Sequence, residues 1–180
     1  MIDWPEQPQQ RPLIGGNPAA GPAYLRTTGR FGLAATNQSD QLAKALGCQL
    51  RDIRQPGACL ILGSGEFMYL PMRTASFMGQ EVFFHTTTRS PILSQSRDDY
   101  PIFNKRSFPS VEQPDVPNYV YGIPNDRDYR DIFVLFERVV SDENLNELNR
   151  VLADIQGIRL YFVDVVGQRM YQAREGKEKK

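Results

Sequence analysis

The sequence predicts an α/β domain with a mostly parallel sheet, helices on both faces and an irregular N-terminal strap. Two observations lead to this prediction. The runs Ala58–Leu62 and Ile132–Phe136 are short, unbroken apolar stretches, which are typical of strands buried on both faces of a sheet. Each run is followed by an expected helix and then by another apolar run, an order that favours parallel pairing.

The composition fits a single domain. The chain has 180 residues, of which 41% are hydrophobic and 11% aromatic, and this is enough apolar material for one core. Residues 1–29 are rich in proline and glycine, which suits an extended strap better than regular structure. We expect a strap at 1–29, an α/β domain at 30–171 and a charged, solvated tail at 172–180.

The first helix is expected over residues 39–50, where leucine and alanine recur at helical spacing and a serine or an aspartate can cap the N-terminus. The strand at 58–62 follows. Pro71 then stands where a second helix would have its first residue, and Gly79 stands where that helix would end. A strand over 81–87 completes a strand, helix, strand unit, for which a right-handed crossover is expected.

The second half of the chain repeats this order after an irregular segment. Residues 91–130 contain six prolines and are expected to form a long covering loop with little regular structure. A strand at 132–136, a helix at 141–155 with its leucines on one face, and a strand at 158–165 then form a second unit.

Charge and cysteine content exclude several classes of protein. Lysine plus arginine equals aspartate plus glutamate at 21 each, so no net field favours a nucleic acid or an anionic membrane. Cys48 and Cys59 lack metal-binding spacing and His85 is the only histidine, which makes a disulfide scaffold or a zinc site improbable. No basic leader and no run of about 18 apolar residues is seen. We expect a cytoplasmic protein with no cofactor, no bound metal and no nucleic-acid or membrane partner.

Two segments concentrate the residues that could carry chemistry. The Gly63 loop, residues 63–69, follows the first predicted strand, and the Thr86 loop, residues 86–91, follows the second. In an open parallel sheet, ligands bind beyond the carboxyl ends of the strands, and both loops leave their strands at that end. We therefore predict that the two loops converge at one rim of the sheet and form a site for an anion.

In the Gly63 loop, Gly63, Ser64 and Gly65 are candidate ligand-binding residues, because glycine permits tight turns and close approach of a ligand. The loop lacks a dinucleotide fingerprint, since Met68 stands where the third glycine would be. Glu66 suits ribose hydroxyls, an amino group or a metal ion shared with a ligand, and it is the candidate catalytic acid or base. The alternative is that Glu66 only caps the following helix.

In the Thr86 loop, Thr86, Thr87, Thr88 and Ser90 supply four hydroxyls and Arg89 supplies a guanidinium. Ser90 and the proline after it could begin a short helix, whose N-terminus would add backbone N–H groups. Together these groups predict a phosphate cradle. The alternative is a plain strand edge, with Arg89 paired to a surface carboxylate.

Two further residues could carry chemistry, Arg30 and His85. Arg30, which directly follows the strap in the sequence Thr28-Gly29-Arg30-Phe31-Gly32, is a candidate ligand-binding residue that could reach into a cleft, although such an arginine is more often a solvated turn residue. His85 is expected to be a core or strand-edge histidine rather than a general base.

Three motifs resemble a known family. Residues 63–69 (GSGEFMY) and 87–92 (TTRSPI), with 28–33 (TGRFGL) upstream, are similar to the TRSP domain, which takes its name from the motif at 88–91. The resemblance covers about residues 25–140. Domains of this family usually follow a phosphoribosyltransferase domain of the orotate type in bacterial gene clusters associated with tellurite resistance and stress.

The resemblance implies a small Rossmann-like, phosphoribosyltransferase-like fold and a role beside a transferase in nucleotide-like metabolite synthesis or stress response. The chain departs from the family pattern at Ser64, where threonine is common, and at Tyr119–Gly122, where asparagine often follows the second tyrosine. No predicted strand ends in the paired acidic residues that such transferases use around the ribose. What remains is similar to a partner domain.

Three functions stay open from the sequence. The domain could bind a phosphorylated nucleotide-like or sugar metabolite and work with a separate phosphoribosyltransferase chain. It could be a free-standing enzyme acting on a nucleotide or nucleoside, with Glu66 as acid or base and Arg89 stabilising charge. It could also be a structural interaction subunit that has no small ligand and docks through the strap and residues 97–127.

Overall fold

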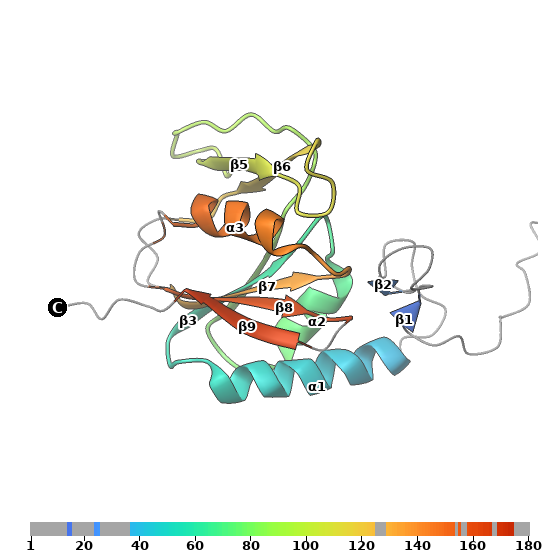
Figure 1. Ribbon diagram of the computed structural model, residues 1–180. Coiled ribbons are helices and arrows are strands. Elements are labelled where there is room, and N and C mark those ends of the chain that lie inside the picture. The colour runs from blue at the N-terminus through green and yellow to red at the C-terminus, as the bar shows by residue number, and fades with distance from the viewer. Residues whose placement is uncertain are drawn as a thin grey trace, which may run out of the picture.

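A computed structural model describes residues 14–15, 24–25, 37–124, 129–153, 155, 158–166 and 169–174. Its centre is a five-stranded sheet in the order β4-β3-β7-β8-β9, in which the first four strands are parallel and β9 is antiparallel (Figure 1). The strands are β3 Ala58–Gly63, β4 Val82–Thr86, β7 Tyr129–Phe136, β8 Arg159–Asp164 and β9 Arg169–Arg174. In the strap, β1 Ile14–Gly15 pairs with β2 Tyr24–Leu25.

Helices cover both faces of this sheet, as predicted. The helices are α1 Asn37–Ile53, α2 Tyr69–Ser76 and α3 Asp142–Val151. α1 and α2 pack on one face, where Leu50 and Leu70 meet Ile61, and α3 packs on the other, where Leu148 meets Leu62 (Figure 1). The α/β prediction with a mostly parallel sheet is therefore confirmed.

The order of the strands creates a topological switch point between β3 and β7. These two strands are neighbours, but the chain leaves β3 toward β4 on one side and leaves β7 toward β8 on the other. Because α2 and α3 lie on opposite faces, the two crossovers share the same hand. In open α/β sheets the crevice at the carboxyl ends of such strands is the usual place for a ligand.

The helix boundaries differ from the predicted ones by a few residues. α2 begins at Tyr69, two residues before Pro71, and ends at Ser76. Proline is tolerated there because the N–H groups of the first turn have no partner within the helix. Gly79 follows the helix with a φ of +97°, a conformation suited to glycine. In α3 the Ser141 side chain accepts a hydrogen bond from the Asn144 N–H and caps the N-terminus.

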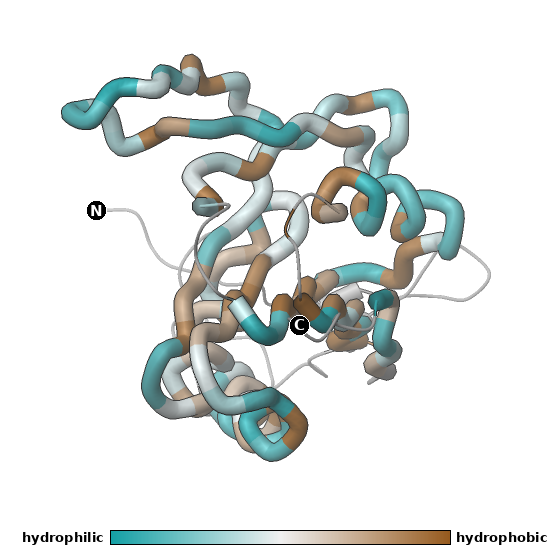
Figure 2. The backbone as a smooth tube through the Cα atoms, turned by 90° about the vertical axis from the view of Figure 1, so that its left-hand side faces the viewer, coloured by the Kyte–Doolittle hydropathy of each residue, from teal (hydrophilic) through white to brown (hydrophobic). Residues whose placement is uncertain are grey.

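The prediction of an irregular loop over residues 91–130 is wrong in part. β5 Lys105–Pro109 and β6 Pro117–Tyr121 form an antiparallel hairpin, which lies beside α3 on the same face of the sheet (Figure 1). A proline stands at an end of each strand, so the usual sign of a chain break also marks the hairpin. The segment 91–104 that leads into it runs along the top of the molecule and is mostly hydrophilic (Figure 2).

The predicted tail begins too early, because residues 172–174 belong to β9. β9 adds an antiparallel edge to the parallel strands, and Phe162 packs edge to face on Tyr171. The Arg174 guanidinium donates to the backbone oxygens of Asn149 and Leu152, at the C-terminal end of α3. Arg174 therefore contributes to the fold, which its charge alone does not reveal.

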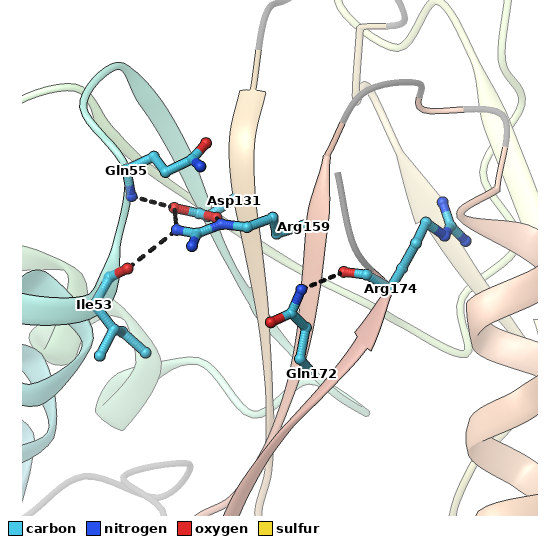
Figure 3. Close-up of polar contacts among 6 residues, drawn as sticks. All are labelled: Ile53, Gln55, Asp131, Arg159, Gln172 and Arg174. Carbon is cyan, nitrogen blue, oxygen red and sulfur yellow. Dashed lines mark hydrogen bonds and ion pairs between the residues drawn. The ribbon is translucent and has the colours of Figure 1, made fainter. Parts of the chain in front are cut away.

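The amino-terminal ends of the strands are held together by a buried carboxylate (Figure 3). Asp131 is 0% exposed and accepts two hydrogen bonds from the Arg159 guanidinium, at 2.6 and 2.8 Å. The Gln55 N–H donates to the same carboxylate, and Arg159 also donates to the Ile53 backbone oxygen. This cluster joins the end of α1 to β7 and β8 at the amino-terminal end of the sheet, opposite the two candidate loops.

Candidate functional site

The two candidate loops meet at the carboxyl ends of β3 and β4. The Thr87 N–H donates to the Gly63 oxygen at 2.9 Å, and the Glu66 N–H donates to the Thr87 oxygen at 2.8 Å. The Thr87 Oγ1 accepts from the Gly65 N–H at 2.7 Å, and the Thr88 hydroxyl donates to Glu66 Oε1 at 2.7 Å. The predicted convergence of the two loops is therefore confirmed, and we call this carboxyl end of the sheet the rim.

Glycine is required in the Gly63 loop because the backbone folds back on itself. A Cβ at Gly63 would lie 1.8 Å from the backbone oxygen of Phe67. Gly65 and Glu66 both have positive φ values, of 59° and 69°. The left-handed conformation is uncommon for a residue with a side chain, so the surrounding contacts must hold Glu66 in place.

Several of the predicted ligand-binding hydroxyls point into the protein. Thr87 is 0% exposed, and its hydroxyl oxygen accepts from Gly65 N–H and from the Asn118 side-chain amide. The Thr86 hydroxyl donates to the Gly63 oxygen. Ser64 is 1% exposed, and its hydroxyl has no hydrogen-bond partner among the residues that the structure describes. The hydroxyls of these side chains therefore point inward, beneath the surface of the rim.

Other predicted residues face solvent. Glu66, Arg89 and Ser90 are exposed, and Thr88 is half-buried. Within the described part of the chain, Arg89 makes no ion pair or hydrogen bond through its guanidinium, so the alternative of a surface ion pair finds no support there. The rim thus presents a carboxylate and a guanidinium on adjacent segments.

The prediction of a short helix starting at Ser90 is wrong, because residues 91–97 are irregular. The Tyr121 hydroxyl holds this segment instead: it donates to the Ser90 oxygen at 2.9 Å and accepts from the Ile92 N–H at 2.7 Å. The Ser90 N–H in turn donates to the Thr88 hydroxyl. These side chains form hydrogen bonds with the backbone at the point where the helix would begin. No helix N-terminus therefore contributes to the site at Ser90.

The sequence did not identify three charged residues near the rim. A Cβ at Gly65 would lie 3.7 Å from Glu112 Oε1, and the Arg138 guanidinium lies 3.8 Å from Glu112 Oε2. Glu137, 4% exposed, directly follows β7. Only Glu137 carried a signal, namely an acidic residue at the carboxyl end of a buried strand. Glu112 comes from the turn of the hairpin, which no local pattern links to the Gly63 loop.

Among the helix N-termini at this end of the sheet, those of α2 and α3 differ in charge. The first turn of α2 has no acidic residue, and its N-cap, Met68, makes no side-chain capping bond. The first turn of α3 contains Asp142 and Glu143. Because a helix N-terminus favours negative charge, the α2 end is the one suited to an added anion, while α3 already has carboxylates there.

The remaining predicted candidates lie elsewhere. Arg30 falls outside the described residues. His85 lies on the edge strand β4, as expected, and its Nδ1 accepts a hydrogen bond from the Thr86 N–H at 2.9 Å. Among the residues described, no three histidine, cysteine, aspartate or glutamate side chains gather as a metal site would require. The catalytic role of Glu66 stays a prediction.

No helix in the described ranges has both the length and the apolar character that crossing a bilayer requires. No curated protein sequence matches the chain. In a structural comparison the chain is similar to the crystal structure of a hypoxanthine phosphoribosyltransferase from Staphylococcus aureus, with 10% sequence identity and a TM-score of 0.44. The match covers 72% of this chain and 64% of that enzyme, so the chain spans less than two thirds of its length.

A second comparison matches the chain to a protein family. The sequence profile described as "TRSP domain C terminus to PRTase_2" matches residues 27–152, which include both candidate loops, the β5–β6 hairpin and the N-terminal part of the second strand, helix, strand unit. The resemblance seen in the three motifs thus extends over most of the chain. The chain belongs to the TRSP domain family.

Proposed function

We propose that this domain binds a phosphorylated metabolite, either nucleotide-like or sugar-like, at the rim and works beside a phosphoribosyltransferase. One observation supports this proposal above the others. The exposed Arg89 has no partner among the described residues and stands next to Thr88, whose hydroxyl holds the Glu66 carboxylate. A cation and an acceptor are thus carried on adjoining segments at the end of the sheet where ligands bind.

The two charged groups suit different parts of such a ligand. The guanidinium of Arg89 matches the geometry of a phosphate and can bind it with two parallel hydrogen bonds. The Ser90 hydroxyl and the uncapped N-terminus of α2 can add donors. Glu66 is an acceptor, which suits sugar hydroxyls and not the phosphate itself. In this proposal Ser64, Thr86 and Thr87 shape the loops and do not contact the ligand.

The role beside a transferase rests on the family description, which puts this domain after a phosphoribosyltransferase domain. Such a transferase handles phosphorylated ribose compounds. A binding site for a phosphate and sugar hydroxyls on the associated domain would accept a substrate or a product of that chemistry. The transferase could be a separate chain or another part of the same protein.

The test measures ligand-induced stabilisation of the purified chain by ribose 5-phosphate, inorganic phosphate and nucleoside monophosphates. We expect at least one of these compounds to raise the Tm, since a ligand that binds only the folded state stabilises it. Arg89→Ala should leave the Tm without ligand unchanged and weaken binding by roughly 10- to 100-fold, as for a lost hydrogen bond to a charged group.

The matched control is Arg51→Ala, which removes another exposed arginine, paired with Asp52 near the opposite edge of the sheet. This variant should bind like the wild type. If none of the compounds raises the Tm of the wild type, or if Arg89→Ala and Arg51→Ala bind equally well, the proposal is wrong.

A further inference from the structure

An aromatic side chain stands beside the rim. Thr88 pairs with Tyr119 of β6: the Thr88 N–H donates to the Tyr119 oxygen at 2.9 Å, and the Tyr119 N–H donates to the Thr88 oxygen at 2.8 Å. Residues paired in this antiparallel way direct their side chains to the same face, with Cβ atoms about 5 Å apart. The Tyr119 ring therefore lies next to Thr88, whose hydroxyl holds Glu66.

The Tyr119 ring rests on a fixed base. It stacks on Tyr121, with the ring centroids 5.9 Å apart and the planes inclined by 27°. Tyr121 is 5% exposed, and its hydroxyl is held by the backbone of Ser90 and Ile92. Tyr119 itself is half-buried and so keeps part of its surface open to solvent. The same tyrosine pair that holds the Thr86 loop thus presents a ring beside it.

A second cation accompanies the ring. The Lys105 Nζ lies 5.6 Å from the centroid of the Tyr119 ring, and Lys105 is exposed. The ammonium is carried on a flexible stem of four carbons, so it can move from the ring to a bound phosphate. A solvent-exposed lysine over an aromatic ring gains only about 0.5–1 kcal/mol, so a ligand can displace it at little cost.

We propose that the ligand of the rim is a nucleoside phosphate, whose base stacks on Tyr119. This inference rests on the proposed function, and it names the class of ligand. A sugar phosphate would use Arg89 and Glu66, but it has no π-face to stack on an aromatic ring. A nucleotide has a π-face as well, and base stacking on an aromatic side chain is favourable for every base. Glu66, Arg89 and Tyr119 are carried on three segments joined directly by hydrogen bonds.

The experiment is isothermal titration of the full chain with AMP, GMP, UMP and CMP, and with ribose 5-phosphate as the ligand that lacks a base. We expect at least one nucleotide to bind more tightly than ribose 5-phosphate. Tyr119→Ala should weaken binding of that nucleotide by about 5- to 100-fold, the range that stacking accounts for, and should change ribose 5-phosphate binding by less than about twofold.

Two variants separate stacking from other roles of the residue. Tyr119→Phe keeps the ring and should retain nucleotide binding within about threefold, since stacking does not need the hydroxyl. Tyr171→Ala removes another exposed tyrosine, on β9 at the far edge of the sheet, and should bind like the wild type. Circular dichroism and the Tm of each variant establish that the fold is kept.

The outcomes distinguish the two proposals. If the nucleotides and ribose 5-phosphate bind the wild type equally, or if Tyr119→Ala weakens both alike, the assignment of a nucleoside phosphate is wrong while phosphate binding at Arg89 stands. If none of these compounds binds the wild type, both proposals are wrong. Selective loss of nucleotide binding in Tyr119→Ala supports the inference.

Discussion

Thr87 lies at the centre of the contacts between the two loops. Its backbone N–H and oxygen bond to Gly63 and Glu66, and its hydroxyl oxygen accepts from Gly65 and Asn118. A threonine in a run of hydroxyl residues was expected to face a ligand, yet this one is fully buried. The next residue, Thr88, turns its hydroxyl to Glu66 instead, so neighbours in such a run can have different roles.

The first prediction concerns this hydroxyl. Thr87→Val keeps the shape of the side chain but leaves the Gly65 N–H and the Asn118 amide without their acceptor. Leaving a buried donor unsatisfied costs about 1–3 kcal/mol, and we expect the free energy of unfolding to fall by at least that amount. Urea denaturation followed by circular dichroism measures it.

Thr87→Ser is the matched control, because it keeps the hydroxyl and loses only a methyl group, at a cost of about 0.8 kcal/mol. Equal stability of the valine and serine variants would show that the two hydrogen bonds contribute nothing.

At the scale of elements, the Asp131 cluster links parts of the chain that are far apart in sequence. The carboxylate binds Arg159 of β8 and the N–H of Gln55, which follows α1. The hydrogen bond to Asp131, opposed by partial burial, raises the pKa of Arg159 above its ordinary value. The arginine therefore stays charged, and the pair sets the position of the connection between α1 and β3 against the sheet.

The second prediction concerns a variant that lacks one partner of this pair. Arg159→Met leaves Asp131 buried without its cation and should lower the free energy of unfolding by about 3 kcal/mol. Arg51→Ala removes an arginine from an exposed pair with Asp52 and should cost less than about 1 kcal/mol. Denaturation by guanidinium chloride compares the two variants. Similar losses would mean that burial of Asp131 gives the pair no special weight.

Sequence reasoning missed strands that pair in the antiparallel sense, among them β5, β6 and β9. In β5 the exposed Lys105 and Ser107 alternate with Arg106 and the buried Phe108. Because only Phe108 is strongly apolar, this alternation gave little indication of a strand. β9 is made mainly of polar and charged residues and lies at the edge of the sheet. Strands buried on both faces are apolar throughout and easy to find, whereas edge strands and hairpins on the surface are not.

At the scale of the whole molecule, the stability of the fold should depend on pH through Cys59. Burial, and next the negative charge of Asp131, raise the pKa of the Cys59 thiol from 9.0 to about 12. The folded protein thus keeps the thiol neutral where the unfolded chain would ionise it. Stability is complete below about pH 9 and falls as pH rises from there toward about 12.

The third prediction follows from this linkage. Between about pH 8 and pH 10.5 the wild type should lose about 2 kcal/mol more stability than Cys59→Ala, because only the wild type ionises this thiol on unfolding. Urea denaturation of both proteins at the two pH values measures the difference. Tyr171, whose burial raises its pKa to about 12, is present in both and cancels in the comparison. Equal losses of stability in the wild type and in Cys59→Ala would contradict the assignment of this pH dependence to Cys59.

The local pattern of apolar residues was sufficient to find the buried strands and the helices that connect them. Burial on both faces requires an unbroken apolar run, and a helix against a sheet requires an apolar stripe, so each element carries its own signature in the chain. The carboxyl-end rule then placed the Gly63 and Thr86 loops at one rim. The fold class and the location of the candidate site therefore follow from the sequence alone.

Which residues of that rim face outward depended on contacts between distant segments. Thr87 faces inward because Asn118 lies beneath it, and Ser90 begins no helix because Tyr121 binds the backbone around it. Glu112 reaches Gly65 from the turn of a hairpin about 47 positions further along the chain. Such contacts leave no local periodicity, since they are made only when the whole sheet and the hairpin pack together.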